Sequence, residues 1–210
     1  MEANFLNFFF REIDSKLKGN RIQKVYVPLV GVCTIQLEGH KNLILCYISR
    51  HESLFLTSSK PDNPYQPQPL AQWLRKRLRN KRIEELKHDW PHRRLALKLY
   101  PGDEQWLVLD LRQGPYLTAE IPDDFTSEPS WPDLEEVLGN RDNEIWRSYP
   151  QLTPPLRRTL SSLPAKEGQK LLQCLQNNCS DTFYLYSSDN SEALLPWRLP
   201  DSMQDQCTCR

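Results

Sequence analysis

The chain has 210 residues, and its 27 basic and 27 acidic side chains give a formal net charge of zero. This length predicts one domain of ordinary size plus an appendage, and a hydrophobic content of 39% is enough to build a core. No run approaches the ~20 apolar residues of a membrane-spanning helix, and Glu2 stands where a signal peptide carries positive charge. We therefore expect a cytoplasmic protein that is not inserted in a membrane.

A helix over residues 3–18 begins the predicted fold. Apolar side chains recur there at the spacing of one helical face, namely Leu6, Phe9, Phe10, Ile13 and Leu17. Phe5 and Phe8 widen this face, so the helix is expected to lie between layers. Gly19 suits the position just past the helix end. Apolar and alternating runs then predict four antiparallel strands, at residues 21–27, 30–37, 41–48 and 53–57.

A second helix is predicted from about Pro69 to Asn80. Leu70, Leu74 and Leu78 recur every four residues, and asparagine suits the position where a helix ends. Four further strands are expected, at residues 82–87, 93–99, 105–111 and 116–120. This order of elements predicts an α+β domain over residues 1–121, in which two antiparallel four-stranded sheets pack as a sandwich with flanking helices.

The rest of the chain is expected to contain a linker and a small helical region. Residues 122–149 are acidic and contain several prolines, which predicts the linker. Residues 150–210 begin with leucines at helical spacing, and a break near residues 162–165 predicts a helical hairpin. A strand is expected at residues 182–186, followed by a polar tail for which no element is predicted.

Charge is distributed unevenly along the chain. Residues 71–100 carry ten Lys or Arg against three acids, a local charge of +7, whereas residues 101–150 carry three Arg against twelve acids, or −9. A positive surface of this kind suits a polyanion such as RNA. The alternative is a solvated helix face whose arginines pair with the acids of the following segment.

The second predicted helix supplies the first candidate RNA-binding residues. Arg75, Lys76 and Arg79 point away from its leucine face, and guanidinium groups can form bidentate bonds to phosphate. Trp73 lies beside the leucines, which favours packing in the core over stacking on a base.

No metal, cofactor or nucleophilic site is predicted. The six cysteines form no C-x-x-C pair, and Pro91 between His88 and His92 argues against a shared helical face. No phosphate-cradling glycine loop or Ser/His/Asp arrangement is apparent. We therefore expect neither a cofactor nor a small-molecule substrate.

Several short signatures follow one another in the first 120 residues. Residues 19–28, G-N-R-I-Q-K-V-Y-V-P, are similar to a glycine followed by R-I-x-K-V-Y-x-P. Ser49, Arg50 and L-F-L-T at residues 54–57 resemble an R-x-H-L-T strand. Asn63-Pro64, Pro67 and L-R-K-R-L at residues 74–78 resemble an N-P-x-x-P-P…L-R-K-x-L helix. Together they resemble the N-terminal domain of the NFACT family, ribosome-quality-control factors whose bacterial members include proteins named for fibronectin binding.

The resemblance implies a two-sheet domain like the N-terminal domain of formamidopyrimidine-DNA glycosylases. It also implies binding of tRNA and of the large ribosomal subunit at stalled nascent chains. The helical hairpin after residue 150 would then be a reduced form of the family's middle region. Because the family's coiled coil and C-terminal domain are missing from the sequence, the resemblance implies a truncated member.

One departure concerns an Asp-Arg pair that the family carries at the start of a strand and that is tied to tRNA binding. The matching positions are Arg93 and Arg94, so the arginine is kept and the aspartate is not. We hypothesise that Arg94 meets RNA phosphate, with tRNA selection weakened or lost. The alternative is that both are ordinary strand-end surface residues. The candidate RNA-binding residues are thus Arg75, Lys76, Arg79, Arg93 and Arg94.

Two other functions stay open. The resembling glycosylases use an N-terminal proline amine as nucleophile, and Glu2 occupies that position, so we expect no enzyme and at most a catalytically dead nucleic-acid binder. A protein-interaction module, like a fibronectin-binding domain, is compatible with the acidic segment 123–144 and the exposed prolines.

Overall fold

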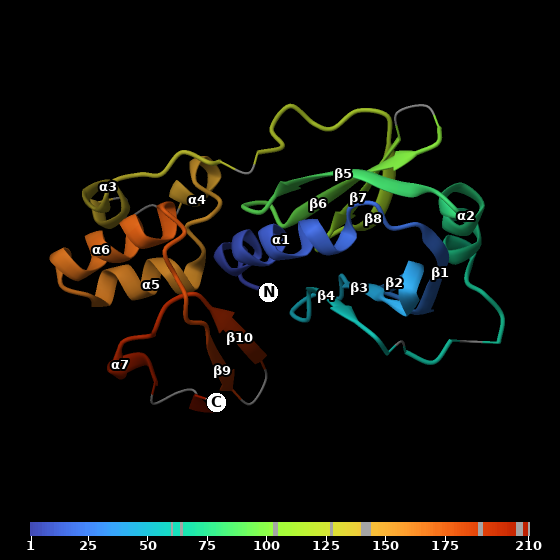
Figure 1. Ribbon diagram of the computed structural model, residues 1–210. Helices are drawn as coiled ribbons and strands as arrows, with labels where there is room; N and C mark the ends of the chain where they lie inside the picture. The colour runs from blue at the N-terminus through green and yellow to red at the C-terminus, as the bar shows by residue number, and fades with distance from the viewer. Residues whose placement is uncertain are drawn as a thin grey trace. The chain divides into compact units, whose positions relative to one another are not determined.

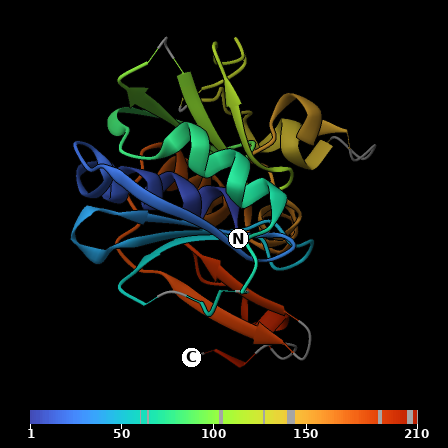
Figure 2. The ribbon, with the colours of Figure 1, turned by 90° about the vertical axis from the view of Figure 1, so that its right-hand side faces the viewer.

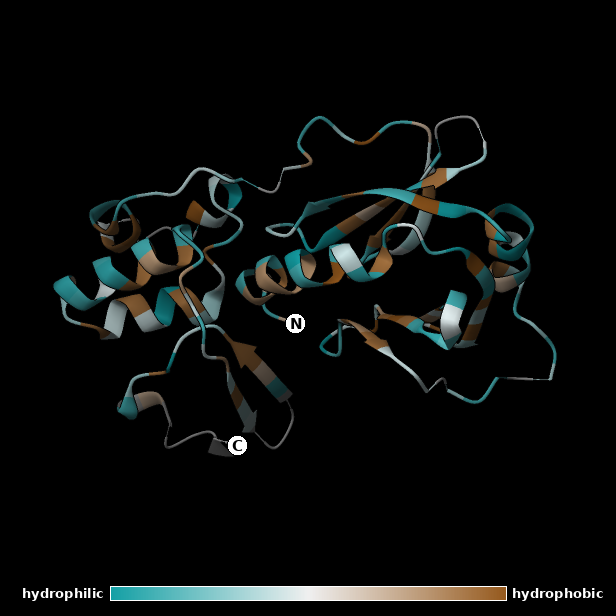
Figure 3. Cartoon of the chain, in the orientation of Figure 1, coloured by the Kyte–Doolittle hydropathy of each residue, from teal (hydrophilic) through white to brown (hydrophobic). Residues whose placement is uncertain are grey.

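The computed structural model describes residues 1–59, 61–63, 65–102, 105–126, 128–139, 144–188, 191–204 and 208–209. Pro64 of the N-P signature lies outside these residues. The chain forms two compact units (Figure 1). The sheet unit comprises residues 10–89 and 93–125, and the helical unit comprises residues 1–9, 90–92 and 126–210. Figure 3 shows that apolar residues are concentrated in the helices and strands, and that the connections are mostly hydrophilic.

Two antiparallel four-stranded sheets form the sheet unit, as the sequence predicted. The first has the order β1 (Ile22–Leu29), β2 (Val32–Leu37), β3 (Asn42–Cys46) and β4 (Ser53–Thr57), with the short 3-10 helix η1 (Glu38–His40) between β2 and β3. The second has the order β5 (Arg82–Asp89), β6 (Arg94–Tyr100), β7 (Gln105–Asp110) and β8 (Gly114–Thr118). Each strand pairs with the next in sequence, so the hairpin-length gaps set the topology.

Helix α1 (Ala3–Leu17) runs between these two sheets along its second half, as Figures 1 and 2 show. Phe10, Ile13 and Leu17 in that half are almost fully buried. Phe10 is therefore a core residue, whereas Phe5, Phe8 and Phe9 are half-buried. Gly19, with φ of 85°, follows the helix end, where glycine is favoured because it has no Cβ.

Helix α2 (Pro69–Leu78) begins with proline at its first position, where the missing N–H costs no helical hydrogen bond. It ends at Leu78, shortly before the predicted stop at Asn80, which adopts the left-handed conformation with φ of 64°. Ala71, Leu74 and Leu78 are buried on one side of the helix.

The two sheets meet at a corner made of main-chain hydrogen bonds. Residues 19–22 before and in β1 run beside residues 80–83 at the start of β5. Four main-chain N–H groups donate to carbonyl oxygens across this corner. The donor and acceptor pairs are Gly19 to Ile83 at 2.8 Å, Ile83 to Asn20 at 2.9 Å, Ile22 to Lys81 at 2.9 Å and Asn80 to Ile22 at 2.8 Å. This corner fixes the end of α2 against the beginning of β1.

The helical unit contains short helices and a small sheet. Its helices are α3 (Leu134–Gly139), α4 (Ile145–Ser148), α5 (Pro154–Ser162), α6 (Ala165–Gln176) and α7 (Asp201–Gln204). In its sheet, β9 (Tyr184–Ser188) lies between β10 (Ser191–Leu195) and β11 (Thr208–Cys209). The predicted hairpin of α5 and α6 is present, because leucines from both helices share one core with Leu134 and Val137.

The polar tail departs from the prediction, because it forms β10, α7 and β11 instead of remaining without elements. Leu195 and Trp197 are buried in the core of the helical unit, and the Trp197 indole N–H donates to Thr159 Oγ1 at 3.1 Å. Burial of these two apolar side chains stabilises an ordered structure in a segment that is otherwise mostly polar. No described helix is long and apolar enough to cross a lipid bilayer.

Candidate nucleic-acid interface

Helix α2 presents a basic flank toward β1. A residue turns about 100° around the helix axis from the one before it, so Arg75, Lys76 and Arg79 fall within roughly one quadrant of the helix surface. This flank adjoins the buried side of α2, and Arg75 is half-buried while Lys76 and Arg79 are exposed. The structure thus brings together three of the five residues selected from the sequence.

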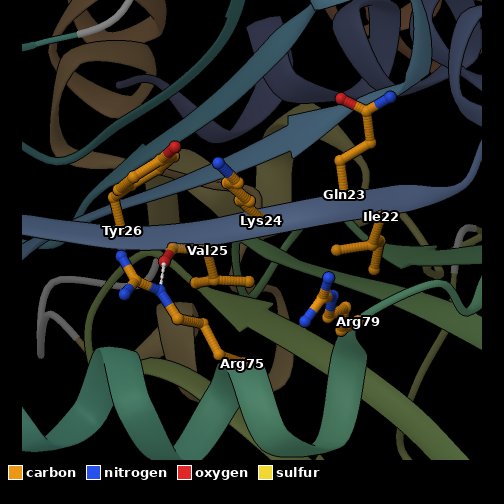
Figure 4. A pocket seen from close by; sticks show the side chains of 7 residues that line it. All are labelled: Ile22, Gln23, Lys24, Val25, Tyr26, Arg75 and Arg79. Atoms are coloured by element: carbon orange, nitrogen blue, oxygen red, sulfur yellow. Dashed lines mark hydrogen bonds between the residues drawn. The ribbon is translucent and has the colours of Figure 1, made fainter.

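Arg75 is held in place by strand β1. Its Nε–H donates to the Val25 carbonyl at 2.6 Å, and its guanidinium carbon lies 5.0 Å from the centroid of the Tyr26 ring (Figure 4). A guanidinium group has five N–H donors, so this bond leaves the Nη groups for other partners. The hydrogen bond and the ring contact together fix the side chain before any ligand arrives.

The strand side of the site depends on a β-bulge. The register of β1 with β2 shifts between Ile22 and Lys24, so the strand contains one extra residue, Gln23. Gln23 and Lys24 are therefore both exposed, while Ile22 and Val25 on either side are fully buried. Figure 4 shows Gln23, Lys24 and Tyr26 projecting from β1, and Arg75 and Arg79 reaching toward the same strand from α2.

These side chains surround a pocket of about 300 Å³. Its lining residues are Ile22, Gln23, Lys24, Val25, Tyr26, Arg75 and Arg79 (Figure 4). Three cations and no carboxylate line it, and among the described residues no carboxylate oxygen lies within ion-pair distance of Lys24, Lys76 or either arginine. Uncompensated positive charge of this kind favours an anionic partner.

The main-chain corner holds α2 and β1, the two elements that line this pocket, in a fixed position relative to each other. Asn80, directly after Arg79, donates its N–H to Ile22, and Arg21 Nη1 donates to the Asn80 carbonyl at 3.1 Å. The segment after α2 and the start of β1 therefore each donate a hydrogen bond to the other. A site on such fixed elements loses little conformational entropy when a ligand binds.

Arg94 lies elsewhere, at the start of β6. Its Nε–H donates to Asp89 Oδ2 at 2.6 Å, and Nη2 pairs with Asp89 and with Asp124 Oδ1 at 3.1 Å. The guanidinium carbon also lies 5.2 Å from the Phe125 ring centroid. Burial by itself would lower the pKa of Arg94, but hydrogen bonds and charge from the two aspartates outweigh it and raise that pKa. Arg94 is thus occupied by carboxylates of its own chain.

The five selected residues consequently form two groups. Asp89 pairs with Arg94 at one end of the β5–β6 ladder, and Arg82, next to the end of α2, pairs with Tyr100 at the other. Those pairs lie roughly 23 Å apart at the rise of a β-strand. Arg93 sits in the turn before β6 with φ of 63°. The basic stretch is therefore continuous in sequence but not in space.

Trp73 differs from the expectation that it would join the core. Its side chain is 40% exposed, and the Arg77 guanidinium carbon lies 4.3 Å from its ring centroid. Trp73 is about 100° from Leu74 around the helix, on the flank opposite Arg75, so core packing was the wrong interpretation.

Sequence reasoning missed the contribution of β1. Lys24 and Tyr26 lie within the R-I-x-K-V-Y signature, but the local excess of basic residues that indicated a site begins about fifty positions later. The run I-Q-K-V, with two polar residues between two apolar ones, is the signal of a bulge that turns both polar side chains outward.

Comparison with known proteins agrees with the fold and the signatures. Residues 3–107 match the family described as NFACT N-terminal and middle domains. A search of curated protein sequences gives no significant match.

Three solved structures share the architecture. The N-terminal part of the fibronectin/fibrinogen-binding protein of Streptococcus suis is 19% identical, with a TM-score of 0.57 over 97% of this chain and 93% of that one. The N-terminal domain of fibronectin-binding protein PavA of Streptococcus pneumoniae is 17% identical, with a TM-score of 0.53 over 94% and 91%. The fibrinogen-binding protein of Staphylococcus aureus is 14% identical, with a TM-score of 0.62 over 100% and 94%. Because the family match over residues 3–107 covers half of its length, this chain belongs to the NFACT family.

Proposed function

We propose that this protein is an RNA-binding module that contacts tRNA and the large ribosomal subunit at stalled nascent chains. The observation that carries the proposal is the basic flank of α2, where Arg75, Lys76 and Arg79 stand beside Lys24 without an ion-pair partner among the described residues. Membership of the NFACT family supports a ribosome-related partner.

Phosphate binding is the chemistry that this flank offers. Each Lys or Arg that neutralises a phosphate releases condensed counterions, so affinity falls steeply as salt rises. The α2 group is a better candidate than Arg94, because Asp89 and Asp124 already neutralise that guanidinium.

Binding of labelled tRNA at several salt concentrations tests the proposal. Lys76→Ala with Arg79→Ala should weaken binding and reduce the slope of log affinity against log salt by about 1.5. The matched control is Lys166→Ala with Lys170→Ala, which removes two exposed cations from α6. Equal effects of the two double variants would assign the binding to net charge alone and remove the proposed surface.

A protein ligand is the competing outcome. The similar streptococcal and staphylococcal proteins are named for fibronectin and fibrinogen binding. If this chain binds immobilised fibronectin with affinity that changes little with salt, and does not bind tRNA, the protein-interaction function replaces the RNA-binding one.

The N-terminus supports a role without catalysis. Glu2 is 7% exposed, and its Oε1 accepts hydrogen bonds from Asn4 and from Thr153 Oγ1. The residue in the position of the glycosylase nucleophile is thus a buried hydrogen-bond acceptor. We expect no cleavage of oxidised-purine DNA by this protein.

A further inference from the structure

We propose that the pocket between β1 and α2 holds a single unstacked nucleotide of a bound RNA, with its phosphate at Arg79. This inference rests on the proposed RNA-binding function and specifies which part of the RNA enters the site. The ligand is a nucleoside phosphate from a single-stranded segment.

The size of the pocket argues for a nucleotide over a smaller or a larger ligand. Its volume of about 300 Å³ lies at the lower end of the range for small-molecule sites and greatly exceeds the space that a phosphate ion fills. A base within a duplex is stacked on both faces and cannot enter a pocket of this kind without leaving the helix. The site therefore selects a loop, bulge or strand end.

The charges at the rim suit the phosphate. Arg79 follows the end of α2 and lies on the α2 side of β1, whereas Lys24, from the bulged part of β1, projects to the other side of that strand (Figure 4). Both are exposed, and neither has a carboxylate partner among the described residues. A phosphodiester oxygen at Arg79 would receive charge-assisted hydrogen bonds from its guanidinium group, and Lys24 would add to the positive charge at the site.

Arg75 provides the surface for the base. Its guanidinium group is held over the Tyr26 ring and anchored at Nε by the Val25 carbonyl. Unstacked RNA bases stack on guanidinium planes and aromatic rings held in this way. Because Arg75 is already ordered, binding a base there requires little further loss of side-chain freedom.

Titration of the whole chain with adenosine 5′-monophosphate tests the pocket, followed by amide chemical shifts in NMR spectra. We expect changes in amide chemical shift that are confined to residues 22–26 and 75–79. Inorganic phosphate and adenosine should each bind more weakly than adenosine 5′-monophosphate. Single-stranded RNA should compete with the nucleotide, whereas a blunt duplex of the same length should compete poorly.

Two matched variants sharpen the test. Arg79→Ala should weaken nucleotide binding about tenfold, as expected for loss of a charge-assisted hydrogen bond. Arg77→Ala removes the same charge from the same helix but on the Trp73 flank, outside the pocket, and should change binding less than about twofold. Arg75→Lys keeps the charge and removes the planar group, so it should weaken AMP more than inorganic phosphate.

The outcomes separate the two proposals. One outcome is that tRNA binds and the double variant Lys76→Ala with Arg79→Ala weakens that binding, but AMP changes no amide chemical shift in residues 22–26. This outcome overturns the pocket proposal and leaves the RNA-binding surface in place. Equal affinity for AMP and inorganic phosphate would likewise reduce the pocket to a simple anion site and overturn it. Absence of any RNA binding would remove the proposed function itself.

Discussion

Arg94 and Asp89 form a cross-strand ion pair at the closed end of the β5–β6 hairpin. Asp89 is completely buried, and the Arg94 side chain is only 14% exposed. Arg94 also reaches the exposed carboxylate of Asp124 in the segment after β8. One guanidinium group therefore joins a buried and an exposed carboxylate, and the two contacts should differ strongly in their effect on stability.

Arg94→Ala should lower the free energy of unfolding by about 3 kcal/mol, because it removes a cation that pairs with the buried Asp89 carboxylate. Asp124→Ala removes the other partner, which is 63% exposed, and should cost less than about 1 kcal/mol. Urea denaturation of the three proteins at pH 7 measures both values. Similar losses for the two variants would show that burial of Asp89 does not dominate the pair.

His88 makes folding stability depend on pH. Burial lowers the pKa of His88, the charge of Arg11 lowers it further, and Asp14 and Asp89 oppose these effects only in part. The unfolded chain then binds the proton more readily than the folded one, so stability should fall as pH decreases through the ordinary histidine pKa of about 6.5. Urea midpoints at pH 7.5 and 5.5 measure this loss.

His88→Gln supplies the control for that pH dependence. Glutamine keeps a polar side chain of similar length without a titrating group, so the difference between the two midpoints should shrink. An unchanged difference would assign the pH dependence to other groups.

Glu2 should contribute to stability through its hydrogen bonds. Its Oε1 accepts from the Asn4 side chain at 2.9 Å and from Thr153 Oγ1 at 2.8 Å. Glu2→Ala removes the acceptor of the Thr153 hydroxyl and one of the two acceptors of the Asn4 amide, which also donates to the Gln151 carbonyl, and should cost about 1–3 kcal/mol. Glu12→Ala, which removes an exposed acid paired with Lys16, should cost less than about 0.5 kcal/mol by thermal or urea denaturation. A Glu2→Ala protein as stable as Glu12→Ala would contradict the structural role.

The cysteines should differ sharply in reactivity. Cys33 is fully buried, and burial raises the pKa of its thiol to about 12, whereas Cys179 is exposed. At pH 8 only about one Cys33 in ten thousand would be thiolate, the form that reacts with alkylating reagents. Mass spectrometry after timed iodoacetamide treatment should find Cys179 modified first, and Cys33 modified only after denaturation. Early labelling of Cys33 in the folded protein would be the opposite result.

The sequence predicted the two sheets well because each hairpin carries its own information. Apolar alternation defines each strand, and short gaps force neighbours to pair antiparallel, so no long-range knowledge is needed. Asn80 illustrates the same point for α2, since its place after Leu78 predicted the helix end that its positive φ confirms.

The site was harder to predict, because it depends on contacts between residues far apart in the chain. Arg75 meets Val25 fifty positions away, and the bulge at Gln23 places both Gln23 and Lys24 on the exposed side of β1. Arg94 shows the converse: its pair with Asp124 fits the alternative in which arginines pair with acids of the following segment, but the sequence did not indicate which arginine would do so. Charge counted along a sequence does not report which cations share a surface.

The junction of β1 with β5 depends mainly on the polypeptide backbone. Its four main-chain hydrogen bonds involve no side-chain atoms, so the exposed Arg82 can be replaced by most amino acids without loss of these bonds. Proline is excluded at Gly19, Ile22, Asn80 and Ile83, because all four donate an N–H that an imino acid lacks. The charge at position 82 can therefore be changed to alter the electrostatics beside the pocket, provided that those four donors are retained.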